Sequence, residues 1–370
     1  MKIAQIAPLA ECCPPRLYGG TERIVSYLTE ELVRLGHEVT LFASGDSRTS
    51  ARLVSTCDIA LRLNSAVRDQ LPYQMMMLDE VRRRAGEFDV LHFHVDLLHY
   101  PLAANFADKM VTTLHGRLDL PDLKPFYSYF RGFPLVSISN HQRNPMPPVN
   151  WAGTVYHGLP EALLPFNAKP ADYLAFLGRI SPEKRPDRAI TIAARAGIRL
   201  KIAAKIDKVD EPYWNTLIEP MIRAHPNVEF IGEIDEHQKA EFLGNARALL
   251  FPIDWPEPFG LVMIEAMACG TPVIAFSGGS VPEVIDKGMT GYVVKDVDDA
   301  IGAVRMIDRL DRAVVRGVFE KRFTVERMAT EYLEIYRNLP GVRRAFVRKP
   351  AFADQFPANP DEPGNMQAVA

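Results

Sequence analysis

Short apolar segments alternate with amphipathic helical segments along most of this chain, and this alternation constrains the fold more than any other feature of the sequence. A regular change between strand-like and helical periodicity is typical of parallel α/β layers, in which each helix returns the chain to the start of the next strand. The sequence therefore predicts an α/β fold with parallel sheets. The strands that we expect are residues 2–7, 38–43, 90–94, 110–114 and 135–139, followed by 173–177, 199–203, 228–231, 248–251 and 272–276.

The expected strands form two sets, separated by residues 145–170, which are rich in Pro and Asn. A chain of 370 residues is long enough for two domains, and a cleft between domains is a common place for a ligand. Near the end of the chain, an apolar stripe at helical spacing is followed by residues with several prolines and no periodicity. The stripe consists of Met328, Tyr332, Ile335 and Tyr336. We therefore expect an N-terminal domain of residues 1–165, a C-terminal domain of residues 166–322, a helix of residues 323–340 and a mobile tail of residues 341–370.

The composition excludes several classes of protein. The 43 Lys and Arg residues are balanced by 46 Asp and Glu residues, which argues against bulk binding of nucleic acid. Four cysteines without a C-x-x-C pair, and a first segment that resembles a strand rather than a signal peptide, favour a reduced, cytoplasmic protein. No run of about 18 apolar residues occurs, and the basic residues 82–84 are a weak sign of a membrane-binding helix, so we expect membrane association to be peripheral at most.

Glycines and charged residues gather where the expected strands end. In open parallel sheets, ligands bind beyond the carboxyl ends of the strands. Polar residues placed at random would not follow the strand ends. We therefore expect the carboxyl ends of the strands in the two domains to face one cleft. The residues in these positions are Gly19, Gly20, His115, Gly116, Ser139, Gly178, Arg179, Lys205, Glu257, Gly278 and Gly279.

The most informative segment is EPFGLVMIE, residues 257–265, in which two carboxylates, Glu257 and Glu265, are eight residues apart. We expect a helix whose first turn is formed by Phe259, Gly260 and Leu261, with backbone N–H groups that lack partners within the helix and favour an anion such as phosphate. At about 1.5 Å per residue, the two carboxylates could bracket a ligand of roughly 10 Å, one at a sugar and the other at a ribose.

A second segment, GRISPEK at residues 178–184, places two cations on the loop before the next helix. Gly178 permits a tight turn, and Arg179 and Lys184 can clamp a diphosphate, since each charge pair contributes about 4 kcal/mol at most at 4 Å and an effective dielectric constant near 20. In the first domain, Gly19 and Gly20 allow backbone amides to approach a phosphate or sugar closely. The chain lacks the G-x-G-x-x-G and G-x-x-x-x-G-K-[ST] motifs, which argues against a hydride-transfer enzyme and a P-loop enzyme.

Several histidines are concentrated in the first domain. His115 ends an expected strand before Gly116, and this position directs it toward the cleft. His92 and His94 share one face of a strand, but no acidic residue or cysteine lies near them in the sequence, so we expect no metal site.

Together, the two-domain pattern, the Gly-Gly loop, TLHG, GRISPEK and the E-x7-E pair in EPFGLVMIE resemble glycosyltransferase family 4 over residues 1–338. The resemblance implies the GT-B fold, in which two Rossmann-like domains face a cleft and a C-terminal helix crosses back to the first domain. It also implies a retaining transferase that uses a nucleotide-diphosphate sugar without a metal or other cofactor. The sequence departs from the family at Ala203-Ala204-Lys205, where a glycine-rich turn is frequent, and at His157-Gly158, where Asn-Gly is common.

The resemblance also implies roles for individual residues. Arg179 and Lys184 would hold the diphosphate, Glu265 would bind the ribose, and His115 would lie beside the anomeric carbon. The predicted catalytic residues are His115, Glu257, Arg179 and Lys184. The predicted donor-binding residues are Gly19, Gly20, Gly178, Arg179, Lys184, Phe259, Gly260, Leu261 and Glu265, and the acceptor-side candidates are Tyr18, His94 and Ser139.

The sequence thus predicts the transfer of a hexose from a nucleotide sugar, with UDP-glucose favoured by the resemblance, to a hydroxyl group of a small-molecule or lipid-linked acceptor. No Asp or Glu of the first domain stands out as a covalent nucleophile, which favours attack on the same face from which the diphosphate leaves. Two alternatives share this architecture. A nucleotide-sugar 2-epimerase would require an acid and a base for elimination, and a non-catalytic nucleotide-sugar-binding module could dispense with Glu257 and His115.

Overall fold

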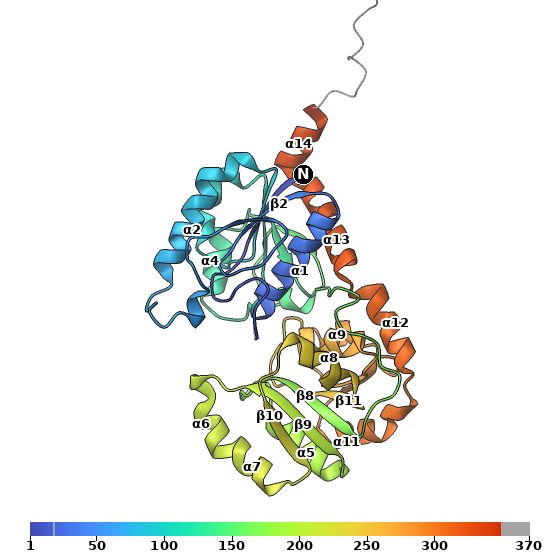
Figure 1. Cartoon of the computed structure of the whole chain (residues 1–370). Helices are drawn as coiled ribbons and strands as arrows, with labels where there is room; N and C mark the ends of the chain where they lie inside the picture. Colours follow the sequence, from blue (N-terminus) through green and yellow to red (C-terminus); the bar gives the residue numbers. More distant parts are fainter. Residues whose placement is uncertain (18, 349–370) are drawn as a thin grey trace, which may run out of the picture.

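The computed structural model describes residues 1–17 and 19–348, which form two α/β domains arranged end to end (Figure 1). The N-terminal domain contains a seven-stranded sheet in the order β3-β2-β1-β4-β5-β6-β7, and the C-terminal domain a six-stranded sheet in the order β10-β9-β8-β11-β12-β13. Neighbouring strands are parallel throughout both sheets, which confirms the predicted fold class. The strands are β1 Lys2–Ile6, β2 Glu38–Phe42, β3 Arg52–Val54, β4 Val90–Phe93, β5 Met110–Thr113, β6 Leu135–Ser137, β7 Trp151–Thr154, β8 Tyr173–Arg179, β9 Arg199–Lys205, β10 Val228–Gly232, β11 Ala248–Phe251, β12 Val273–Phe276 and β13 Gly291–Val294.

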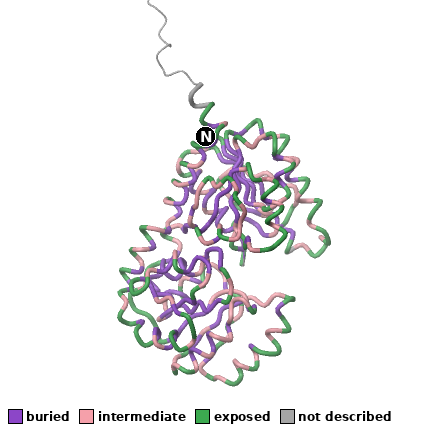
Figure 2. Tube along the Cα trace, turned by 180° about the vertical axis from the view of Figure 1, so that it is seen from behind, coloured by how far each residue is buried: buried purple, intermediate pink, exposed green. Residues whose placement is uncertain are grey.

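Helices cover the sheets and leave the strands in the interior, as the burial of the chain shows (Figure 2). In α1, residues Ile24, Leu28 and Leu32 recur every four positions and are fully buried, because this spacing places them on the face toward the sheet. Within the described residues, no helix is both long and apolar enough to span a membrane. The helices are α1 Gly20–Arg34, α2 Leu71–Arg84, α3 His99–Ala103, α4 Leu123–Tyr129, α5 Pro186–Ala196, α6 Glu211–Tyr213, α7 Glu219–Ala224, α8 Glu236–Gly244, α9 Leu261–Ala268, α10 Val281–Val284, α11 Val297–Met306, α12 Arg312–Arg322, α13 Val325–Asn338 and α14 Pro340–Arg348.

Three strands were not expected from the sequence: β3, β7 and β13. All three lie at an edge of their sheet and are only partly buried, so they lack the continuous apolar segment by which the inner strands were recognised. β7 falls within residues 145–170, which we expected to separate the two sets of strands. β8 is longer than expected, because Gly178 and Arg179 continue its ladder with β9 instead of following the strand.

The helix α13 crosses back from the C-terminal domain and packs against the first domain, as the family resemblance implied (Figure 1). The Thr324 side chain caps its N-terminus by accepting a hydrogen bond from the amide of Arg327. Its apolar stripe faces the N-terminal sheet, where the hydroxyls of Tyr332 and Tyr336 bond to Thr113 and His92 at 2.9 and 2.7 Å. The predicted helix is therefore confirmed, and within its apolar stripe Met328, Tyr332 and Tyr336 are buried while Ile335 is half-buried.

The predicted tail begins with a helix, because residues 341–348 form most of α14. Pro340 suits the first turn of this helix, where a missing N–H costs nothing, and Val342 is buried. Asp108 anchors the helix, because its carbonyl accepts from the Gly341 amide and its carboxylate from Arg344, both at 2.7 Å. The remainder of the predicted tail, residues 349–370, lies outside the described residues.

The chain passes between the domains twice, and the two crossings touch at Gly158. Leu159 pairs with Thr324 in a parallel bridge, with 2.9 Å backbone bonds from Leu159 to Phe323 and from Val325 to Leu159. A Cβ atom at position 158 would collide with the carbonyl of Thr324. This close approach of two backbones explains why the position requires glycine.

Replacing Gly158 by Ala is therefore expected to lower the free energy of unfolding by about 1–3 kcal/mol, the usual effect of overpacking a rigid contact. Urea unfolding followed by circular dichroism measures this change. Gly86→Ala is the matched control, because nothing lies within 4 Å of a Cβ there and its backbone is not left-handed. Equal stability of the two variants would contradict the packing argument.

Candidate active site

A pocket of about 540 Å³ lies between the two domains and is lined by residues of both. It collects segments that are far apart in the sequence, since the carboxyl ends of both sheets open into it. His94 and Ser139 do not line it, and Tyr18 lies outside the described residues. The predicted site residues that do line the pocket are Gly19, Gly20, His115, Gly178, Arg179, Lys184, Glu257, Phe259, Gly260, Leu261 and Glu265.

The E-x7-E segment differs in detail from its prediction. α9 begins at Leu261, so Phe259 and Gly260 precede the first turn instead of forming it. Gly260 adopts a left-handed conformation with φ of 79°, and a Cβ there would lie 2.8 Å from the side chain of Met263. The buried ring of Phe259 anchors the loop, which leaves the first amides of α9 at the edge of the pocket.

Glu257 forms the centre of a compact polar cluster. Its Oε2 atom accepts hydrogen bonds from the ammonium of Lys184 and, at 3.0 Å, from the indole N–H of Trp255. The ammonium also lies 4.9 Å from the ring centroid of Trp255 and 5.6 Å from that of Phe251, a geometry that stabilises a cation. Lys184 and Glu257 are thus held in one arrangement before any ligand binds.

Sequence reasoning did not identify Trp255 or Lys239 as part of the site. Trp255 directly precedes the P-E-P sequence, and an aromatic residue beside a carboxylate is the signal that could have indicated it. Lys239 lies on α8 and bonds to Glu265 Oε1 at 2.7 Å. It could not be recognised, because only the fold brings it to Glu265, which is buried in α9.

Arg179 is surrounded by carboxylates. Its guanidinium bonds to Glu183 and lies 3.2 Å from Asp210 and 3.8 Å from Asp207. Burial raises the pKa of Asp210, although the nearby charge of Arg179 opposes that effect. An anionic ligand that reached this guanidinium would compete with these carboxylates for its N–H groups.

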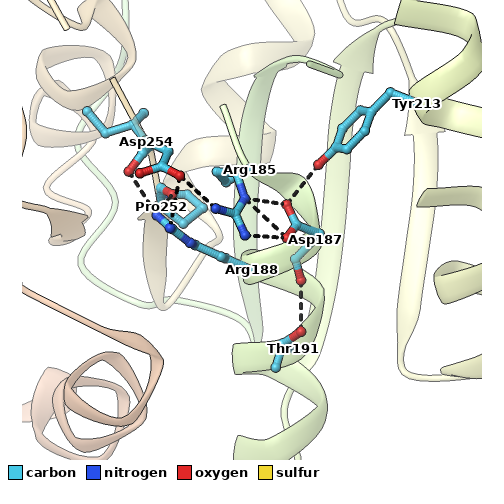
Figure 3. A network of polar contacts seen from close by, with 8 residues as sticks. Arg185, Asp187, Arg188, Thr191, Tyr213, Pro252 and Asp254 are labelled. Atoms are coloured by element: carbon cyan, nitrogen blue, oxygen red, sulfur yellow. Dashed lines mark hydrogen bonds and ion pairs between the residues drawn. The ribbon is translucent and has the colours of Figure 1, made fainter. Parts of the chain in front are cut away.

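A charged network ties together the two loops that carry Lys184 and Glu257 (Figure 3). Arg185 lies between Asp187 and Asp254 and bonds to each at 2.8 Å, and Arg188 adds a 3.1 Å contact to Asp254. The Asp254 amide also donates to the Glu183 carbonyl at 2.8 Å. Arg185 is the one non-glycine residue with positive φ among the described residues, and these contacts offset the cost of that conformation, about 1–2 kcal/mol.

Two neutral histidines, His115 and His157, lie on the N-terminal side of the pocket. The Nε2 atom of His115 is 2.8 Å from Nδ1 of His94, and the His157 ring stacks on that of His115 with centroids 5.3 Å apart. Desolvation lowers the pKa of His115 to about 3 and holds the pKa values of His94 and His157 well below the ordinary value. At neutral pH, His115 therefore contributes hydrogen-bonding groups to the pocket, not a positive charge.

The placements of two acceptor-side candidates need correction. His94 is buried behind His115, because both of its ring nitrogens bond to protein groups. Ser139 is also fully buried, and its hydroxyl donates to the carbonyl of Pro258 at 2.6 Å. His94 and Ser139 follow the ends of β4 and β6, but they contact protein atoms instead of the pocket surface.

Two groups of contacts join the domains around the pocket. On one side, the carboxylate of Glu283 accepts from the amides of Asn140 and His141 at 2.8 and 2.7 Å and from the Tyr156 hydroxyl at 2.8 Å. On the other side, Arg23 of α1 forms an ion pair with Glu236 of α8. The pocket walls are therefore held together by contacts on both sides.

Comparisons with known proteins agree with this architecture. Residues 18–152 match the family model described as "Glycosyltransferase Family 4", and residues 165–311 match the model "Glycosyl transferases group 1". The chain is 27% identical to an N-acetyl-alpha-D-glucosaminyl L-malate synthase of Bacillus anthracis, over 88% of this chain and 96% of that protein. It is 33% identical to a D-inositol 3-phosphate glycosyltransferase of Streptomyces scabiei, over 39% of this chain and 32% of that protein.

Solved structures share the fold. AviGT4, a glycosyltransferase involved in avilamycin A biosynthesis, superposes with a TM-score of 0.68 and 22% identity, over 92% of this chain and 98% of its own. HepE of Anabaena, solved in complex with UDP and glucose, superposes with a TM-score of 0.69 and 16% identity, over 92% of this chain and 100% of its own. The chain therefore belongs to glycosyltransferase family 4, and it is a glycosyltransferase with the GT-B fold.

The buried histidines lead to a pH prediction. Desolvation lowers the pKa of His99 to about 3, and its Nε2 atom bonds to Thr112 at 2.8 Å. Because the pKa of a histidine in the folded state lies below its unfolded value of about 6.5, its stabilising contribution is complete above pH 6.5 and is lost as the pH falls toward 3. We expect His99→Gln, which can keep the bond to Thr112 but cannot titrate, to reduce the pH dependence of the unfolding free energy by about 1.4 kcal/mol per pH unit between pH 6 and 4.

Urea titrations of the wild-type protein and of His99→Gln at several pH values in this range measure the effect. Parallel curves for the two proteins would show that His99 binds a proton as readily in the folded state as in the unfolded state.

Proposed function

We propose that this glycosyltransferase moves a hexose from UDP-glucose to a hydroxyl group of an acceptor with retention of configuration and without a metal ion. The observation that carries the proposal is the convergence in one pocket of Lys184, Glu257, the first turn of α9 and, from the opposite domain, His115. Cations and helix amides suit the diphosphate, a carboxylate suits sugar hydroxyls, and a neutral histidine opposite them suits the reacting end of the sugar.

The catalytic step requires stabilisation of a leaving diphosphate. Negative charge grows on the diphosphate as the bond to the sugar carbon breaks, and Lys184, Arg179 and the amides at the start of α9 can stabilise that charge more strongly in the transition state than in the ground state. Lys184 currently shares its charge with Glu257, so the ammonium can turn one of its three N–H groups to the diphosphate while it retains the carboxylate.

Attack from the face of the leaving group fits the composition of the N-terminal wall. Among its described residues that line the pocket, Glu22 is the one carboxylate, and its Oε1 atom accepts a 3.3 Å hydrogen bond from the amide of Glu11. This bond holds Glu22 against the loop that follows β1. In the proposed reaction the acceptor hydroxyl attacks the sugar carbon while its proton passes to a departing phosphate oxygen, so that no protein nucleophile forms a bond to the sugar.

The nature of the two substrates is inferred from relatives. Structures of HepE have been solved with UDP and with UDP-glucose, which supports a UDP sugar as the donor here. The names of the relatives point to different acceptors, L-malate and D-inositol 3-phosphate, so for this chain we propose only a small-molecule or lipid-linked hydroxyl compound. We place the reaction in the cytoplasm because all four cysteines are free thiols, as expected in a reducing compartment.

Removing the Lys184 ammonium tests its proposed role in binding the diphosphate. We expect Lys184→Ala to lower kcat by about 100-fold or more, because one charged donor to the leaving group is lost. Release of UDP from UDP-glucose, by transfer or by slow hydrolysis, measures turnover. Lys321→Ala, at an exposed position of α12, is the matched control. Near-normal turnover of Lys184→Ala would contradict the proposed role.

A thermal-shift panel of UDP-, GDP- and ADP-glucose tests the donor. A ligand at a hundredfold excess over its dissociation constant stabilises the folded protein by about 2.7 kcal/mol, so we expect the largest increase in melting temperature with UDP-glucose. If only GDP-glucose or ADP-glucose raised the melting temperature, the proposal of a uracil nucleotide would be wrong.

Incubation with the best donor and no acceptor separates transfer from epimerisation, because formation of an epimer would identify a nucleotide-sugar 2-epimerase.

A further inference from the structure

A chain of buried hydrogen bonds leads from the pocket to the C-terminal helix. His115 Nε2 is 2.8 Å from His94 Nδ1, and His94 Nε2 is 2.8 Å from the side-chain oxygen of Gln5 in β1. The amide nitrogen of Gln5 then donates to the hydroxyl of Tyr336 in α13 at 3.1 Å. His94 and Gln5 are buried, so no bulk water can substitute for these partners.

The direction of this chain follows from its chemistry. The Gln5 oxygen can only accept, so His94 must carry its proton on Nε2. Burial lowers the pKa values of His94 and His115, and both rings are neutral with one proton each. The Nδ1 atom of His94 is consequently unprotonated and can only accept, so His115 must donate to it from Nε2. The single proton of His115 is thus on Nε2, and its Nδ1 atom is unprotonated.

The amide orientation of Gln5 determines this outcome, and in the structure the amide nitrogen faces the hydroxyl of Tyr336 on α13. Because Tyr336 accepts from Gln5, its own O–H is available to His92 Nδ1 at 2.7 Å. His92 Nε2 continues to Thr113 at 2.7 Å, and Thr113 to the hydroxyl of Tyr332 at 2.9 Å. Every bond in this series has one donor and one acceptor when it is read in the same direction.

The other ring nitrogen of His115 is in a different situation. Nδ1 is buried and has no hydrogen-bond partner among the described residues, and His115 lines the interdomain pocket. A buried polar atom without a partner is costly, which indicates that a ligand group completes it. Because it is unprotonated, Nδ1 of His115 can accept a hydrogen bond from a hydroxyl, but it cannot donate one to a phosphate or carbonyl oxygen.

We propose that Gln5 is a positioning residue for His115: through His94 it holds His115 as the Nε2–H tautomer, and Tyr336 of the C-terminal helix fixes the Gln5 amide. The helix that crosses back from the second domain therefore contributes to the reaction chemistry of the first. The tautomer is a property of the folded chain, and its effect on turnover rests on the proposed function.

Nitrogen NMR of the wild-type protein labelled with ¹⁵N-histidine tests the tautomer directly, because the protonated and unprotonated nitrogens of a neutral imidazole differ widely in chemical shift. Signals of His115 among the nine histidines are assigned by their loss in His115→Asn. We expect the proton on Nε2 of both His115 and His94. A proton on Nδ1 of His115 would overturn the proposal and leave the proposed function standing.

Two tyrosine variants of α13 provide a matched pair. Tyr336→Phe removes the partner of Gln5 and is expected to give a mixture of His115 tautomers, whereas Tyr332→Phe removes only the last bond of the series and is expected to keep the wild-type spectrum. An unchanged spectrum in Tyr336→Phe would show that this hydroxyl does not fix the amide. The wild-type spectrum still decides the tautomer if a variant fails to fold.

Kinetics connect the tautomer to turnover. Gln5→Leu removes the acceptor of His94, and we expect kcat/KM to fall about tenfold, the effect of one hydrogen bond lost in the transition state, together with a mixture of His115 tautomers. Tyr332→Phe is expected to stay close to the wild type in both measurements. A kinetic loss in Gln5→Leu with an unchanged spectrum would assign Gln5 a purely structural role. If the wild type transferred no sugar, the proposed function would fail while the NMR result remained valid.

Discussion

The contact between Lys184 and Glu257 is the interaction on which the rest of the site depends. It joins the loops that follow β8 and β11, which are neighbouring strands of one parallel sheet, so their carboxyl ends necessarily lie together. The pair is largely removed from water, where loss of one partner leaves an uncompensated charge. Trp255 and the network around Arg185 hold the same two loops, so both charges can meet a ligand without reorganisation.

Lys184 and Glu257 can bind a ligand together with the N-terminal wall of the pocket only if the two domains keep their relative positions. Those positions depend on contacts between the domains. The bond from Ser139 to Pro258 reaches the loop that carries Glu257, and Glu283 binds the chain just beyond Ser139. The helix α13 fixes the same wall from behind, since Tyr336 and Tyr332 enter the hydrogen-bond series that ends at His115. The residues that line the pocket are therefore connected, through hydrogen bonds, to the residues that join the domains.

Much of the fold and part of the site could be predicted, for physical reasons that also explain the failures. Strands buried on both faces have continuous apolar segments and were recognised, but the edge strands β3, β7 and β13 are only partly buried and show no such segment. The charged and glycine residues at strand ends meet in the pocket because parallel sheets place them there. Lys239 became visible only in three dimensions, whereas Trp255 stands beside Glu257 in the sequence and was overlooked. His94 and Ser139 have the right positions along the chain, but their polar atoms bond to other protein groups.

The two walls differ in how strongly chemistry constrains them, which explains why the sequence indicates the reaction better than the acceptor. A diphosphate needs several convergent donors, and such donors occur in short motifs such as residues 178–184 and 257–265. The N-terminal wall instead presents single groups from separate elements of the chain: the neutral ring of His115, the buried carboxylate of Glu22 in α1, and Arg62, which lies 3.4 Å from Glu11. A hydroxyl acceptor can be oriented by many such combinations, so no short motif is required and acceptor preference can change while the donor grip remains.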